Sequence, residues 1–148
     1  MHDIRNFVQL TDNYGTAGQP GADQFAMIAD NGYRHVINIA MPDHPDAIAN
    51  EGKLVSALGM NYIHIPVPFD NPGPPQLRLF CKLLDGIGDE KVFIHCIMNY
   101  RVSAFMYHYL SKVKGLPEQQ ARSEMFQKWD MEPVWQDLMK WSSADIGL

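Results

Sequence analysis

Long apolar runs are missing from this 148-residue sequence. No stretch approaches the roughly 18 consecutive apolar residues that a membrane-spanning helix needs, and residues 1–13 are too polar for a secretory signal. The sequence therefore predicts a soluble protein with no membrane partner. We expect a cytoplasmic location, or a periplasmic one if a signal peptide was removed.

Cysteines and basic residues are also scarce. The two cysteines, Cys81 and Cys96, are too few for a disulfide framework, and neither has a partner at metal-ligand spacing. We therefore expect reduced thiols, no metal and no other cofactor. Twelve Lys and Arg against 17 Asp and Glu give a net charge of -5 without a basic cluster, which argues against nucleic acid as a partner. The oligomeric state is not predicted.

The residues that are present suffice for one core. A hydrophobic content of 46% over 148 residues, with no repeat or linker, predicts a single domain spanning residues 1–148. Three apolar, β-branched runs, at 36–40, 62–67 and 92–94, predict strands buried on both faces. A helical pattern precedes each of them, at 23–32, 47–59 and 75–87.

The alternation of strands and helices predicts an α/β fold. We expect a mostly parallel sheet of four to five strands flanked by helices, with ligands bound beyond the carboxyl ends of the strands. Residues 7–10 and 15–20 predict a short hairpin. The C-terminal third is predicted to be helical, with helices at 102–113, 117–129 and 133–141. Trp129, Trp135 and Trp141 have the helical spacing of core residues.

One loop carries the residues suited to chemistry. Residues 91–105 read KVFIHCIMNYRVSAF, so Cys96 directly follows a predicted strand and Arg101 lies where the next helix begins. A helix N-terminus presents free N–H groups and a partial positive charge, which attract an anion and favour a thiolate. The planar guanidinium of Arg101 can hold two oxygens of a tetrahedral oxyanion. The loop therefore predicts an anion site with a thiolate nucleophile, whereas Cys81, on an apolar helix face, is predicted to be inert.

The His95-Cys96 pair, the short loop and Arg101 resemble the signature of the cysteine-dependent protein tyrosine and dual-specificity phosphatases. Residues 16–20 (TAGQP), 32–40 and 59–67 (GMNYIHIPV) are similar to bacterial phosphatase-like proteins related to the beta-lactamase-hydrolase-like proteins. The resemblance covers roughly residues 14–112. It implies a phosphatase-like fold and hydrolysis of phosphate monoesters, with a phosphorylated protein or small molecule as substrate.

The resemblance also assigns roles to residues. Cys96 would attack phosphorus and form a cysteinyl-phosphate, Arg101 would hold the phosphate, and Asp70 would protonate the leaving oxygen. His95 would order the loop and tune the thiolate. The residues implied to surround the substrate phosphate are His95, Ile97, Met98, Asn99, Tyr100, Arg101 and Ser103.

Two departures keep alternatives open. Four residues separate Cys96 from Arg101 where the phosphatase signature has five, and Asn99 stands near a signature glycine. A four-residue interval also resembles the active loop of rhodanese-like sulfurtransferases, in which the cysteine carries a persulfide. A non-catalytic phosphate-binding module is the third reading. Asp70 lies in DNPG, which is also ordinary turn sequence, and Asp43 and Asp46 are weaker candidates for the acid.

Overall fold

The computed structural model describes residues 1–148 and contains one five-stranded sheet in the order β1-β2-β5-β3-β4. The strands are β1 (Val8–Gln9), β2 (Tyr14–Ala17), β3 (His35–Asn38), β4 (Asn61–His64) and β5 (Val92–His95). Only β1 runs antiparallel to its neighbour, in the predicted hairpin with β2. The predicted α/β fold, with a mostly parallel sheet and a helical C-terminal part, is confirmed.

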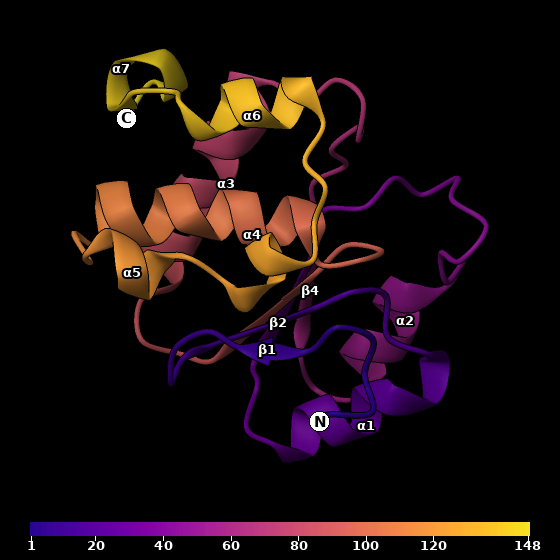
Figure 1. The fold of residues 1–148 in the computed structure, drawn as a ribbon. Helices are drawn as coiled ribbons and strands as arrows, with labels where there is room; N and C mark the ends of the chain where they lie inside the picture. The colour runs from indigo at the N-terminus through magenta and orange to yellow at the C-terminus, as the bar shows by residue number, and fades with distance from the viewer.

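Helices cover both faces of the sheet (Figure 1). The α-helices are α1 (Phe25–Asp30), α2 (Glu51–Ala57), α3 (Pro74–Ile87), α4 (Tyr100–His108), α5 (Glu118–Ala121), α6 (Pro133–Met139) and α7 (Ser143–Ile146). Short 3-10 turns occur at Ala22–Gln24 and Glu124–Gln127, and α4 continues into a π-helical turn at Tyr109–Val113. In Figure 1, α1 and α2 lie on one side of the sheet and α3, α4 and α6 on the other. None of the helices has both the length and the hydropathy needed to cross a membrane.

The central strands β3 and β5 contribute to a core on each face. Val36 and Phe93 pack in the cluster that contains residues of α1 and α2, whereas Ile37 and Ile94 pack in the cluster of α3, α4 and α6. All four side chains are fully buried. Successive strand residues point to opposite faces, so a strand covered on both sides needs a continuous apolar run.

The strand predicted at 62–67 is shorter and more exposed than expected. β4 ends at His64, and its residues are half-buried or exposed because it is an edge strand with a single neighbour, β3. The chain beyond it stays bonded to the sheet, since the Val67 N–H donates to the Ile39 carbonyl at 3.1 Å. This bond holds the chain after β4 at the carboxyl edge of the sheet.

The predictions at 23–32, 75–87 and 133–141 are confirmed to within a few residues, but two other helices were misjudged. The helix predicted at 47–59 begins only at Glu51, and Leu58 of its expected apolar stripe is 40% exposed. The segment 117–129 is interrupted because Arg122 is extended. Ser123 then caps a new turn, its hydroxyl oxygen accepting from the Met125 N–H at 3.2 Å.

Candidate active site

Cys96 lies at the carboxyl end of the central strand β5, and the chain enters α4 at Tyr100 four residues later. The connecting loop turns at Asn99, whose φ of 67° and ψ of 17° lie in the left-handed region. Glycine adopts this conformation most readily, and asparagine is among the few other residues that do so regularly. Asn99 therefore meets a backbone requirement that glycine usually meets, near the position of the signature glycine.

The Asn99 side chain also ties the loop to the rest of the fold. Its Nδ2 donates to the Asn6 carbonyl at 2.9 Å and to Thr16 Oγ1 at 3.1 Å. Ser103, buried one turn into α4, donates its hydroxyl to the Asn99 carbonyl at 2.6 Å. The side chain of Asn6 in turn donates to the Met98 carbonyl at 2.9 Å. Ser103 and Asn99 thus lie behind the loop and support its shape.

Gly18 gives the loop a close backbone contact. A Cβ atom at this position would collide with the Ile97 carbonyl oxygen. The neighbouring Gln19 N–H donates to that same oxygen at 3.0 Å. The segment after β2 therefore fixes the Ile97 peptide from one side, which requires glycine at position 18.

Arg101 is 6% exposed and is oriented by its surroundings. Its Nη1 donates to the Val67 carbonyl at 2.8 Å, and its guanidinium carbon lies 5.4 Å from the centre of the Phe69 ring. Its Nε is buried and has no hydrogen-bond partner. An unpaired donor on a buried cation is costly unless an anion completes it. The Arg101 guanidinium therefore keeps hydrogen-bonding capacity for an anion.

Cys96 and Arg101 share a cavity of about 260 Å³ with mostly apolar walls. The residues that line it are His44, Phe69, Cys96, Ile97, Met98, Tyr100, Arg101 and Glu132. At one wall the ring of Tyr100 stacks on Trp129, with centroids 5.2 Å apart. Trp129 also donates its indole N–H to Glu132 Oε1 at 2.9 Å. Five of the predicted site residues thus line one cavity: Cys96, Ile97, Met98, Tyr100 and Arg101.

Asp70 is not among the residues that line this cavity. It is exposed, and the preceding Phe69 takes the inward position, where its carbonyl accepts the Trp135 indole N–H at 2.7 Å. Glu132 and His44 line the cavity instead, and no sequence pattern singled out Glu132 or Phe69. Asp43 and Asp46 are exposed, and Asp46 pairs with Arg5 at 3.1 Å.

His95 is fully buried beneath the loop and pairs with a carboxylate that sequence analysis missed. Its Nε2 lies 2.7 Å from Glu51 Oε2, and its Nδ1 lies 3.0 Å from the Cys96 carbonyl oxygen. Burial alone raises the pKa of Glu51, but hydrogen bonds and the positive charge from His95, with help from Gln19 and Tyr62, outweigh it and lower that pKa. The available signal was the spacing of Glu51 four residues before Val55, which places it on the inward face of α2.

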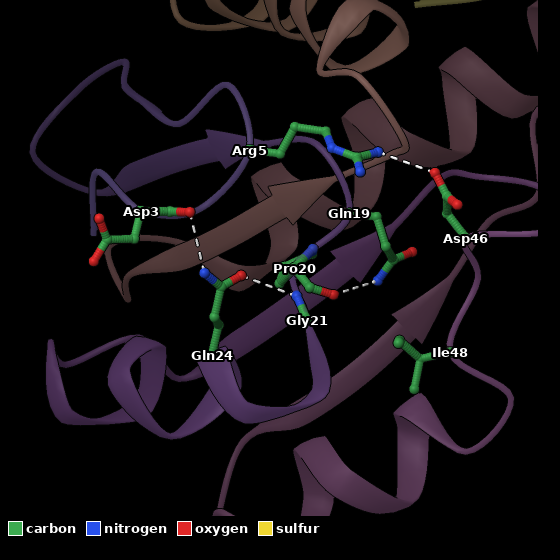
Figure 2. Close-up of a pocket in the computed structure, with 8 residues that line it drawn as sticks. All are labelled: Asp3, Arg5, Gln19, Pro20, Gly21, Gln24, Asp46 and Ile48. Carbon is green, nitrogen blue, oxygen red and sulfur yellow. Dashed lines mark hydrogen bonds and ion pairs between the residues drawn. The ribbon is translucent and has the colours of Figure 1, made fainter.

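The other hollows lack an activated thiol, although one of them is lined by Cys81. The polar hollow in Figure 2, about 400 Å³ in volume, contains no cysteine, and its Arg5 is already paired with Asp46. Cys81 is buried in α3, and burial raises the pKa of its thiol to about 12, so it stays protonated near neutral pH. The prediction that Cys81 is buried on an apolar face is confirmed.

No protein-family model matches the chain. Among curated proteins, the "Beta-lactamase hydrolase-like protein" of two Xylella fastidiosa strains is 28% identical over 110 residues, which is 72% of this chain. The chain spans about a quarter (25%) of the length of these relatives.

Among solved structures, Tk-PTP in its active form has a TM-score of 0.73 at 17% identity, with 91% of this chain and 94% of that chain covered. Pseudomonas aeruginosa TpbA, solved with pTyr, has a TM-score of 0.63 at 16% identity, over 78% of this chain and 68% of that chain. Both likenesses show the protein tyrosine phosphatase fold.

A more similar structure is the "Putative phosphatase (DUF442)" of Shewanella putrefaciens CN-32. It is 33% identical, covers 99% of this chain and 97% of its own, and has a TM-score of 0.87. A second structure of that protein gives 34% identity over 92% of this chain and 87% of its own, with a TM-score of 0.84. The chain therefore belongs to the DUF442 family of phosphatase-like proteins.

Proposed function

We propose that the chain, acting as one domain over residues 1–148, hydrolyses phosphate monoesters through Cys96. The observation that carries this proposal is the cavity that Cys96 shares with Arg101, whose guanidinium still has an unpartnered nitrogen, Nε. A phosphate dianion in this cavity would accept hydrogen bonds from the Arg101 guanidinium and from free N–H groups at the start of α4. Membership of a phosphatase-like family supports the same assignment.

In the proposed reaction the Cys96 thiolate attacks phosphorus. The bond from phosphorus to the leaving oxygen breaks, and that oxygen takes a proton from an acid. Water then attacks the cysteinyl-phosphate, which releases inorganic phosphate and restores the thiolate. The apolar cavity walls suit a single phosphate on an aromatic or aliphatic carrier, supplied by a phosphorylated protein or a small molecule. The pTyr bound by TpbA is an example of such a group.

The proposed acid is Asp70, which is exposed and reaches the cavity only if the turn at residues 69–70 rotates inward. The alternative acid is Glu132, which already lines the cavity. Asp70→Asn and Glu132→Gln distinguish the two. Loss of the true acid lowers kcat much more for phenyl phosphate than for p-nitrophenyl phosphate, because nitrophenolate leaves without a proton. An equal loss with both esters for Asp70→Asn would remove Asp70 from this role.

The main test measures hydrolysis of p-nitrophenyl phosphate and sulfur transfer from thiosulfate on the same preparations. Cys96→Ser should abolish phosphate release, and Arg101→Lys should lower it by roughly 10²–10³-fold because the bidentate clamp is lost. Cys81→Ser is the matched control and should keep full activity. Full activity of Cys96→Ser would refute the proposal. Transfer of sulfur through Cys96 would establish the sulfurtransferase suggested by the four-residue interval, and phosphate binding without turnover would indicate a binding module.

A further inference from the structure

Both ring nitrogens of His95 face hydrogen-bond acceptors. Nδ1 lies 3.0 Å from the Cys96 carbonyl oxygen and Nε2 lies 2.7 Å from Glu51 Oε2. A carbonyl oxygen and an ionised carboxylate carry no hydrogen, so each contact requires a proton on the ring. The geometry therefore describes an imidazolium ion, fully buried below the loop that carries Cys96.

Glu51 is held in the matching ionised state. Its side chain is 2% exposed, and its Oε1 accepts the Gln19 amide N–H at 2.8 Å. The orientation of the Gln19 amide is fixed, because its nitrogen also donates to the Pro20 carbonyl at 3.1 Å, the bond drawn in Figure 2. Exchanging the amide nitrogen and oxygen would break both hydrogen bonds. The lowered pKa of Glu51 agrees with this arrangement: burial acts against ionisation, but the His95 and Gln19 contacts outweigh it.

No other charged group contacts this pair. From α1, the ring of Phe25 packs against His95 with centroids 6.3 Å apart. From β4, Tyr62 accepts the Asn38 amide N–H at 3.0 Å, and burial, together with the nearby Glu51 carboxylate, raises its pKa to about 12, so its hydroxyl is neutral. His64 lines the same small hollow as Glu51, and its Nε2 lies 2.7 Å from the Ala40 carbonyl oxygen. The remaining titratable neighbour is Cys96 itself. The charge of His95 is therefore balanced by Glu51 at Nε2, while Nδ1 faces the backbone carbonyl of Cys96.

We infer that Glu51 is a positioning residue, which keeps His95 doubly protonated and thereby stabilises the Cys96 thiolate. The inference rests on the proposed role of Cys96 as nucleophile. The Nδ1–H bond holds the Cys96 carbonyl under the loop, away from the cavity. The buried positive charge favours a negative sulfur over a neutral one, because there is little water to screen it. Glu51 acts through His95 and does not touch substrate.

Glu51→Gln separates charge from geometry. The new amide nitrogen can donate to His95 Nε2, and its oxygen can still accept from Gln19. His95 then keeps its Nδ1–H bond to the Cys96 carbonyl but becomes neutral. Glu90→Gln is a matched control, because Glu90 pairs with His35 at 3.2 Å at the opposite end of the strands.

The experiment measures the rate of Cys96 alkylation by iodoacetamide between pH 5 and 10, which needs no turnover and is independent of whether the phosphatase proposal holds. Glu51→Gln should slow alkylation about tenfold near pH 6 and leave it unchanged near pH 9.5, since a one-unit shift in the thiol–thiolate balance is tenfold. Glu90→Gln should match the wild type. An unchanged profile, or equal slowing at every pH, would overturn the inference.

A second measurement needs no variant of Glu51. In wild-type protein with ¹⁵N-labelled histidine, the NMR signals of His95, assigned by their loss in His95→Asn, should report protons on both ring nitrogens at pH 7. A single protonated nitrogen would overturn the inference even if Glu51→Gln does not fold.

Discussion

Replacing Asn99 by alanine and by glycine separates the two contributions that this residue makes to the loop. Alanine at a φ of 67° costs about 1 kcal/mol for its left-handed conformation. Either substitution removes the bonds to the Asn6 carbonyl and Thr16 Oγ1, each worth about 1 kcal/mol. Asn99→Ala should therefore lower the free energy of unfolding by about 3 kcal/mol, and Asn99→Gly by about 2 kcal/mol, because glycine adopts this φ freely.

The assay is equilibrium unfolding in guanidinium chloride, with the free energy obtained by linear extrapolation. Both variants should also lower p-nitrophenyl phosphate hydrolysis, since only the bond from Asn6 to the Met98 carbonyl then ties the loop that carries Cys96 to Asn6. The reasoning is refuted if Asn99→Gly is as unstable as Asn99→Ala, because the left-handed conformation would then cost nothing. It is equally refuted if both changes are below about 0.5 kcal/mol, the size expected of a surface substitution.

Two further predictions concern a buried histidine and a close contact. Burial lowers the pKa of His108 from 6.5 to about 4. Between these pH values the unfolded chain binds a proton at His108 and the folded chain does not. Stability should therefore fall by up to about 3 kcal/mol as the pH drops from 6.5 to 4, and this part of the decline should disappear in His108→Gln; identical pH profiles would contradict it. Gly18→Ala should displace the Ile97 carbonyl and lower kcat by about tenfold or more, because catalysis is sensitive to small misplacements of the reacting groups. Wild-type kinetics in this variant would show that the contact is not needed.

The sheet and its main helices could be predicted because each depends on local sequence. The runs at 36–40 and 92–94 are continuous in apolar residues since both strands are covered by helices on two faces. The helix predicted at 117–129 failed for a local reason as well. Ser123 starts a new turn there, and the aromatic residues beyond it pack on the loop wall and not along a single helix face.

The candidate site was predictable only where its residues are neighbours in the chain. Cys96 and Arg101 lie on one loop, so their spacing was visible. Glu51 meets His95 across 44 residues, and nothing near Glu51 in the sequence indicates that partner. Asp70 was selected because it follows a strand, but the turn at 69–70 brings Phe69 inward, an outcome that depends on the packing of Trp135 against the Phe69 carbonyl.

The contacts that tie the loop to Asn6 have a consequence for the order of folding. The bonds from Asn6 to Met98 and from Asn99 to Asn6 join residues 92 and 93 positions apart. Contacts between such distant residues form slowly, because the intervening chain loses conformational entropy before the contacts stabilise it. During refolding, helix content should return first and a competent anion site last. A chain without residues 1–6 would keep Cys96 and Arg101. It would lose both bonds that Asn6 makes to the loop between them.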